Sequence, residues 1–276
     1  MDATKAQVIA SIAALCITTL ALGLVVFWLI RRRGATGIPP QSGNVQTRPF
    51  DLLDLGVVAI LIGYSVLPLI AAAAEKAPDT NAAPASIYTA IAVAVFSLLL
   101  GSCVFIFASL IRGRNPIRLF GLSRLYPHKI LAWAVAAFMV AYTAMIGVVY
   151  IQEYFIGRGE DLQQVVKTLI GTDNAALKVI LAITAMIIAP LIEEIIFRGY
   201  LYAVIKRYSG RCFAAIVTSL LFAIVHGTLP GIMPLFTLAI ILTLVYELTG
   251  CLWVPIATHS LFNAVQISLM LNLQNG

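Results

Sequence analysis

The stretch KVILAITAMIIAPLIEEIIFRGYLYAV, residues 178–204, decides the fold of this chain. It is long enough to cross a bilayer as a helix, which takes about 20 apolar residues. It also carries two adjacent carboxylates, Glu193 and Glu194, and the guanidinium of Arg198. A charged side chain in hydrocarbon costs about 2.5 to 3.5 kcal/mol even on the lowest scales. The stretch therefore predicts a membrane helix whose charged residues have a specific role.

The composition of the whole chain indicates the same class of protein. Of 276 residues, 61% are hydrophobic and 11% are charged, and the mean hydropathy is +0.98. Soluble domains carry about 25% charged residues. We therefore predict an all-α, polytopic transmembrane helical bundle with a short interfacial helix over 160–171. Eight apolar runs are candidate spans: 8–30, 52–74, 87–111, 130–151, 178–204, 211–228, 231–249 and 251–273.

The distribution of basic residues predicts the orientation of the bundle. The net charge is +6, and twelve Lys and Arg residues follow the first, third and fifth spans, against five on the opposite side. Basic loops stay in the cytoplasm, so both termini are expected outside. We find no basic stripe interleaved with exposed aromatics, and we expect no nucleic-acid partner. The twelve basic residues that follow the first, third and fifth predicted spans are Arg31, Arg32, Arg33, Arg48, Arg112, Arg114, Arg118, Arg124, Lys129, Lys206, Arg207 and Arg211.

Two parts of the chain precede the charged stretch. Residues 1–50 are expected to form an anchor helix and a cytoplasmic linker, and residues 51–119 to add further membrane helices. The four cysteines lie in or beside apolar runs with no CxxC spacing, so we interpret them as packing residues. They are Cys16, Cys103, Cys212 and Cys251.

The charged triplet divides into a pair and a single carboxylate. Glu194 and Arg198 are four residues apart, which places them on one helical face as an ion pair. Glu193 points about 100° away and has no arginine at that spacing. Structural pairing therefore explains Glu194 and Arg198 but leaves Glu193 without a partner.

Further along the chain, two histidines and an asparagine fall within apolar runs. Glu193 lies sixteen residues before Ser209, and His226 lies sixteen after Gly210. In an antiparallel hairpin, equal counts place Glu193 and His226 at one height. His259 and Asn263, four apart, share one face of the last span. His259 lies only nine residues from Gly250. In straight helices this would leave His259 and His226 about 10 Å apart in height, unless the last helix tilts or bends near Pro255.

These residue types suit peptide hydrolysis without a serine or cysteine nucleophile. A carboxylate removed from water becomes a stronger base and can take a proton from water. A facing histidine can share that water or pass a proton to a leaving amine. A second histidine and an asparagine can stabilise an oxyanion. The structural alternative is that all of them are helix–helix hydrogen bonds, as we expect for Asp54 and Glu247 near the membrane interfaces.

The segments EEIIFR, FAIVH and HSLFN resemble the EExxxR, FxxxH and HxxxN motifs of the CAAX protease and bacteriocin-processing family. The resemblance covers roughly residues 120–270, and it implies an intramembrane protease core over residues 120–276, related to the CAAX endopeptidases. By motif position, it implies that Glu193 activates water, with Glu194 and Arg198 completing the first motif. It further implies that His226 is catalytic and that His259 and Asn263 stabilise the oxyanion.

Metal dependence is left open by the sequence. Members of this family are commonly labelled metalloproteases, and Glu193, His226 and His259 could hold zinc with a water in the fourth position. No HExxH segment occurs, so a glutamate-activated water without a cofactor is the interpretation we favour.

The partners and location implied are those of a membrane enzyme. We expect the bilayer and a membrane-associated or CaaX-type protein or peptide as partners, in the plasma membrane of a prokaryote. Two other functions use the same residues: a non-catalytic scaffold or bacteriocin-immunity-type protein of this fold, and a proton-coupled transporter. The transporter predicts an internal repeat, which we do not find.

Overall fold

The computed structural model describes residues 43–47, 49–62, 87–107, 111–156, 168–169, 171–226 and 231–275. Within these ranges the regular elements are all helical, which confirms the all-α bundle. The predicted first span, most of the linker before residue 50 and nearly all of the interfacial helix over 160–171 lie outside the described residues.

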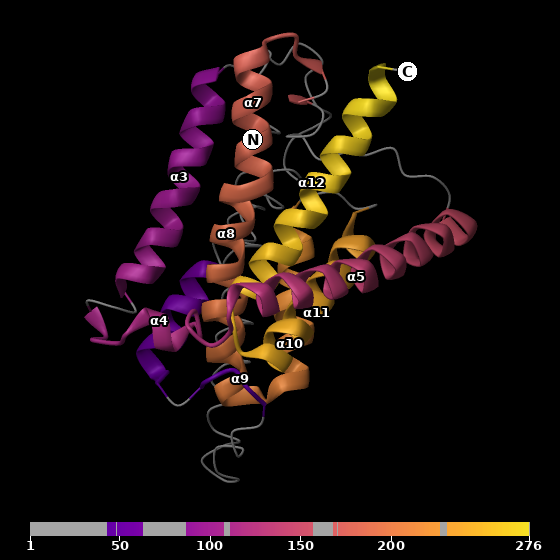
Figure 1. The fold of residues 1–276 in the computed structure, drawn as a ribbon. Helices are drawn as coiled ribbons and strands as arrows, with labels where there is room; N and C mark the ends of the chain where they lie inside the picture. Colours follow the sequence, from indigo (N-terminus) through magenta and orange to yellow (C-terminus); the bar gives the residue numbers. More distant parts are fainter. Residues whose placement is uncertain are drawn as a thin grey trace, which may run out of the picture.

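Figure 1 shows the arrangement of the helices, coloured in chain order. A helix over Leu52–Ile62 precedes the labelled elements. Their bounds are α3 Ile87–Ile106, α4 Pro116–Leu119, α5 Pro127–Ile156, α7 Ala175–Ile183, η2 Thr184–Ile188, α8 Ala189–Glu194, η3 Ile195–Tyr202, α9 Ala203–Ser209, α10 Arg211–Val225, α11 Ile232–Thr249 and α12 Trp253–Asn275.

Four helices in the described part are long and apolar enough to cross a membrane: Pro127–Phe155, Ala175–Ser209, Ile232–Thr249 and Trp253–Asn272. They coincide with four of the predicted spans. The predicted span over 211–228 is present as α10, whose 15 residues reach about 22 Å and so fall short of a hydrocarbon core of about 30 Å. The total of eight spans stays a prediction.

The run from Ala175 to Ser209 is one helix with two π-helical stretches, η2 and η3. It begins at Asn174, whose Oδ1 accepts from the Leu177 N–H, as the capping preference of asparagine predicts. Pro190 has no N–H and interrupts the regular i→i+4 ladder, and the π turn of η2 lies directly before it. The two glutamates lie between the π-helical stretches.

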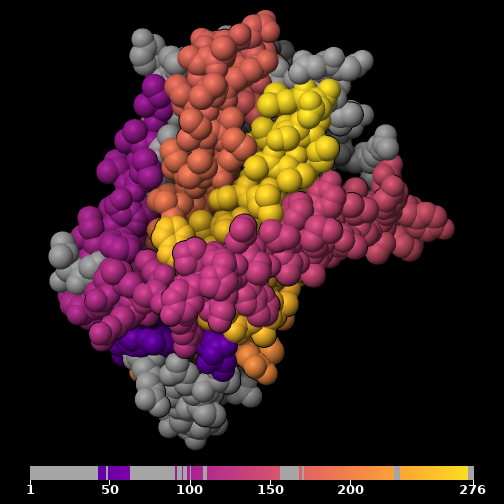
Figure 2. All heavy atoms as spheres, in the orientation of Figure 1, coloured from indigo at the N-terminus to yellow at the C-terminus, as the bar shows by residue number. Residues whose placement is uncertain are grey.

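The C-terminal helices form the packed centre. α10 lies along α11, and α5 packs across both α11 and α12. Figure 2 shows α5 as a continuous band across one face of the molecule. The largest buried cluster includes Phe120, Tyr200, Leu201, Phe222 and Leu252, so the motif-bearing helices belong to the core.

One end of the bundle gathers the basic residues and a well-bonded acidic residue. Asp54 is fully buried; it accepts two hydrogen bonds from Arg114, at 2.9 and 3.0 Å, and one from the Tyr200 hydroxyl at 2.8 Å. Arg112 pairs with Asp51 beside it. A structural role for Asp54, as expected from the sequence, accounts for all these contacts.

A segment over residues 43–47, which we call the strap, crosses this basic end. Its backbone carbonyls accept from three cations: Asn44 from Arg124 at 2.6 Å, Val45 from Lys206 at 3.1 Å and Thr47 from Arg207 at 3.1 Å. Glu247 accepts from Lys206 at 2.7 Å and from the Tyr202 hydroxyl at 2.7 Å. The loops after α3 and α9 therefore lie at the same end of the molecule.

This shared basic end leads to a topological prediction. Reporter fusions at Gly113 and Ser209 are expected to report the cytoplasm, and a fusion at Pro78 the outside, because the basic loops stay inside. An outside signal at Gly113 would overturn the orientation and the side from which a substrate enters.

Candidate active site

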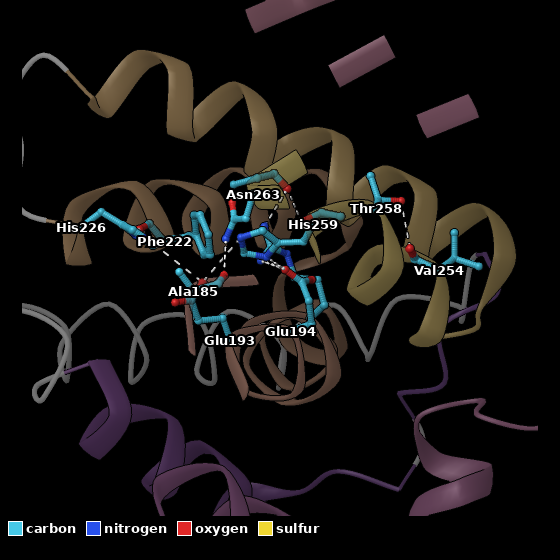
Figure 3. A network of polar contacts seen from close by, with 12 residues as sticks. Ala185, Glu193, Glu194, Phe222, His226, Val254, Thr258, His259 and Asn263 are labelled. Atoms are coloured by element: carbon cyan, nitrogen blue, oxygen red, sulfur yellow. Dashed lines mark hydrogen bonds and ion pairs between the residues drawn. The ribbon is translucent and has the colours of Figure 1, made fainter. Parts of the chain in front are cut away.

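The six side chains singled out in the sequence come together in the interior of the bundle. α8 supplies Glu193 and Glu194, and η3 supplies Arg198. His226 caps the C-terminal end of α10, and α12 carries His259 and Asn263. Figure 3 shows the two glutamates facing the side chains of the other two helices.

Glu194 is fixed in a buried ion pair. Its Oε1 lies 2.7 Å from Nη1 of Arg198, and the side-chain exposures are 0% and 1%. Nη2 of Arg198 donates to the carbonyl of Ala239 at 3.2 Å, which ties the pair to α11. Glu194 Oε2 is buried with no hydrogen-bond partner among the described residues. The predicted i,i+4 pair is therefore formed and structurally anchored.

The same carboxylate orients His259. Nδ1 of His259 lies 2.9 Å from Glu194 Oε1. Because a carboxylate only accepts, Nδ1 carries the hydrogen, and in the neutral ring Nε2 bears the lone pair. Glu194 thus fixes the tautomer and the orientation of His259, as the carboxylate of a catalytic triad does for its histidine.

Glu193 occupies a different environment. Its Oε2 lies 3.8 Å from Nε2 of His226 and 3.8 Å from Nε2 of His259. Glu193 makes no hydrogen bond with any described residue, and its side chain is 26% exposed. A separation above 3.5 Å between polar atoms is typical of a position where water bridges. The carboxylate that the sequence leaves unpaired is therefore flanked by both imidazoles.

His226 presents its Nε2 to Glu193 because its other nitrogen is held. Nδ1 donates to the Phe222 carbonyl at 2.7 Å, which leaves the lone pair of the neutral ring on Nε2. This contact lies at the end of α10, where the last carbonyls have no intrahelical partner. The end of the helix thereby sets the tautomer.

Phe222 is the first residue of the FAIVH segment, and the sequence alone predicts no role for it. Its ring centroid lies 4.5 Å from that of His226 and 5.7 Å from that of His259. The Arg198 guanidinium lies 4.5 Å from the same centroid, within cation–π distance. One buried ring thus contacts both imidazoles and the buried cation, a convergence that only the tertiary structure shows.

Asn263 is positioned by a backbone group of η2. Its Nδ2 donates to the Ala185 carbonyl at 2.8 Å. An amide nitrogen carries two hydrogens, so one remains for another acceptor. Because residues four apart on a helix are neighbours, Asn263 and His259 lie on the same face of α12.

The height difference expected for His259 is closed in the structure, since His259 contacts both glutamates. α12 is one continuous helix from Trp253, so no break at Pro255 is needed. It crosses the α7–α9 helix at an inclination (Figure 1). The π turns also shorten the advance per residue around Glu193.

The three candidate zinc ligands are not arranged as a metal centre. Zinc would need two imidazole nitrogens and a carboxylate oxygen within about 2.0 to 2.2 Å of one point. No group of three His, Cys, Asp or Glu in the described ranges has such an arrangement. We therefore derive no chemical step through a metal.

The other residues noted in the sequence lie elsewhere. His128 is exposed and stacks on Tyr126, in keeping with a solvated residue. Cys103 and Cys212 are exposed and Cys251 is buried, all three as free thiols. Cys16 lies outside the described residues.

Comparisons with known proteins agree with this site. Residues 175–265 match the family model of type II CAAX prenyl endopeptidase Rce1-like proteins, a range that contains all six side chains. The chain is 28% identical over 144 residues to the Bacillus subtilis (strain 168) protein described as "Putative membrane peptidase YdiL", covering 50% of this chain and 56% of that protein. The chain thus spans about half the length of the curated relative it matches. No solved structure matches the chain. These matches confirm that the motif-bearing part of this integral membrane protein resembles the CAAX protease and bacteriocin-processing family, as its sequence indicated.

Proposed function

We propose that this chain is an intramembrane endopeptidase that hydrolyses a peptide bond by activating water on Glu193. One observation carries the proposal: Glu193 Oε2 lies 3.8 Å from Nε2 of both histidines, whereas Oε1 of Glu194 is bonded to Arg198 and His259. A packing role explains Glu194 but gives Glu193 no partner.

The first step is proton abstraction from water. A water beside Glu193 donates one hydrogen to its carboxylate and the other to Nε2 of His226, and its oxygen attacks the scissile carbonyl carbon. Glu193 takes the proton that the water loses. The partial burial of the carboxylate supports this role, because fewer solvent waters compete for it.

The second step is stabilisation of the oxyanion. Protonated His259 donates from Nε2, since Glu194 holds its Nδ1–H and balances the imidazolium. Asn263 donates its second amide hydrogen. Preorganised donors of this kind contribute strongly because they need no reorganisation during the reaction.

The third step releases the amine. The proton held by Glu193 passes to the leaving nitrogen, directly or through His226 Nε2, and the peptide bond breaks. The three steps use Glu193, the two histidines whose Nε2 atoms lie 3.8 Å from it, and Asn263 on the same helix as His259. No serine or cysteine nucleophile is needed.

The substrate class follows from the family. The matching family is described as a CAAX prenyl endopeptidase, and the relative as a membrane peptidase. We propose a membrane-associated protein or peptide, of CaaX type, as substrate. The experiment is cleavage of a library of membrane peptides, prenylated and unprenylated, by the purified full chain in lipid. Absence of any cleavage that depends on Glu193 would contradict the proposal.

Activity is expected to survive exhaustive chelation. The glutamate mechanism needs no metal, and the purified protein should carry no stoichiometric zinc. The measurement is the cleavage rate before and after chelator, together with metal analysis of the same preparation. Loss of activity with recovery on adding zinc would reverse the mechanism and make Glu193, His226 and His259 ligands.

A further inference from the structure

A cavity of about 190 Å³, separate from the candidate active site, lies at the basic end of the bundle. Its walls come from the strap, from α4 and the turn after it, and from the end of α11. It shares no residue with the candidate active site. Figure 1 shows α4 at the end of the molecule opposite the C-terminus.

The lining of this cavity is rich in hydrogen-bond donors and contains no acidic residue. The nearest acid in sequence is Glu247, which is already bonded to Lys206 and Tyr202. An anion therefore meets donors without meeting an opposing carboxylate. The polar lining residues are Asn44, Gln46, Arg118, Ser123, Arg124 and Tyr246.

Arg118 and Arg124 differ from other cations at this end. Arg112 and Arg114 pair with aspartates, and Lys206 pairs with Glu247. The Arg124 guanidinium donates to the Asn44 carbonyl, and neither Arg124 nor Arg118 forms an ion pair with a residue in the described ranges. Two guanidinium groups thus line one cavity without a counter-charge.

Tyr246 adds a hydroxyl to the lining. The residue is 1% exposed and lines the cavity. The hydroxyls of Tyr200 and Tyr202 are bonded to carboxylates, and no such bond links the Tyr246 hydroxyl to a described carboxylate. A tyrosine hydroxyl can donate a hydrogen bond to an oxygen of a ligand in the cavity.

Two glycines that line the cavity, Gly121 and Gly250, each lie so close to a neighbouring group that there is no room for a Cβ atom. A Cβ at Gly250 would lie 1.7 Å from Nη1 of Arg124, and a Cβ at Gly121 would lie 1.8 Å from the Gly250 carbonyl oxygen. Both glycines have left-handed backbone conformations, with φ of +61° and +64°. The position of the Arg124 guanidinium is therefore set by the backbone.

We propose that this cavity binds a phosphate group. Paired guanidiniums match the oxygens of phosphate through charge-assisted, bidentate hydrogen bonds. The source is either the headgroup of an anionic phospholipid in the adjoining leaflet, where phosphates are concentrated, or a soluble phosphate. The cavity serves as a headgroup site or a phosphate sensor, and it does so whether or not the chain is a protease.

The test compares Arg118→Gln with Arg211→Gln in the purified full chain. Arg211 is an exposed arginine at the start of α10 that does not line the cavity, so its loss removes the same charge without touching the lining. The thermal midpoint is followed in detergent during titration with inorganic phosphate, at constant ionic strength set with chloride. It is followed separately during titration with phosphatidylglycerol, with diacylglycerol as the phosphate-free blank.

We expect the wild type and Arg211→Gln to be stabilised at the same ligand concentration. Arg118→Gln should need about 10- to 100-fold more ligand, the usual effect of losing a hydrogen bond to a charged group. A response to phosphatidylglycerol alone identifies a headgroup; a response to inorganic phosphate with no gain from the lipid identifies a soluble ligand.

Two results would overturn the proposal. One is no response to either ligand, and the other is an equal loss in Arg118→Gln and Arg211→Gln, which indicates general attraction to a basic surface. If Arg118→Gln does not fold, Tyr246→Phe makes the same comparison, because it removes only the hydroxyl that faces the ligand.

Discussion

The Glu193→Gln variant is expected to lose about 10² to 10⁴ of its turnover, the usual contribution of general acid–base catalysis. Glutamine keeps the shape of the side chain but cannot take a proton from water. Stability should change little, because Glu193 makes no hydrogen bond with the described residues and stands 3.8 Å from each histidine. The measurements are the cleavage rate and the thermal midpoint in detergent.

The outcome separates an enzyme from a scaffold of the same fold. In a non-catalytic scaffold, Glu193 serves only for packing. The Glu193→Gln variant would then bind partners as the wild type does, and neither protein would cleave a substrate. If Glu193→Gln keeps full cleavage activity, water activation at this carboxylate is wrong. If it loses stability as severely as the neighbouring glutamate variant, both carboxylates are structural.

The Glu194→Gln variant is expected to lose about 3 to 5 kcal/mol of unfolding free energy, because it leaves Arg198 buried without its counter-charge. Arg198 is 1% exposed and cannot reach water without a rearrangement of the core. Since His259 donates to the same carboxylate, activity should fall as well. Thermal midpoint and cleavage rate, measured on one preparation, report the two losses.

A double variant supplies the control for this prediction. Replacing Arg198 by Gln together with Glu194 by Gln removes the whole pair, and losing both charges is milder than stranding one. The double variant should therefore be more stable than Glu194→Gln, while its activity stays low because His259 lacks its orienting carboxylate. A double variant that is less stable than the single one would show that the ion pair is not the main contribution.

The sequence predicted the bundle and the Glu194–Arg198 pair because both follow from local rules. Apolar runs of about 20 residues indicate membrane helices, and i,i+4 spacing places two side chains on one face. The approach of Glu193 to His226 also agrees with equal counts along a helical hairpin. Each of these inferences needs only one helix or two consecutive helices.

Contacts that depend on the arrangement of several helices could not be predicted. Phe222 contacts two histidines and an arginine that come from three other positions in the chain. Asn263 donates to the Ala185 carbonyl, 78 residues earlier in the sequence. The strap is held by carbonyl groups, which every residue carries, so its side chains give no signal of the contacts.

The π-helical stretches η2 and η3 also change what the α7–α9 helix can contact. Each extra residue in a turn rotates everything beyond it by about 100° relative to a regular α-helix. α12 packs on η2 and α8, whereas α10 packs on η3 and α9, and α3 contacts the helix from α7 to η3. The apolar face of the helix therefore turns about the helix axis part of the way along the span. A helical wheel drawn with one constant number of residues per turn would superimpose two different faces. The two glutamates lie at that change of face, where one continuous helix is in effect a joint between two packing environments.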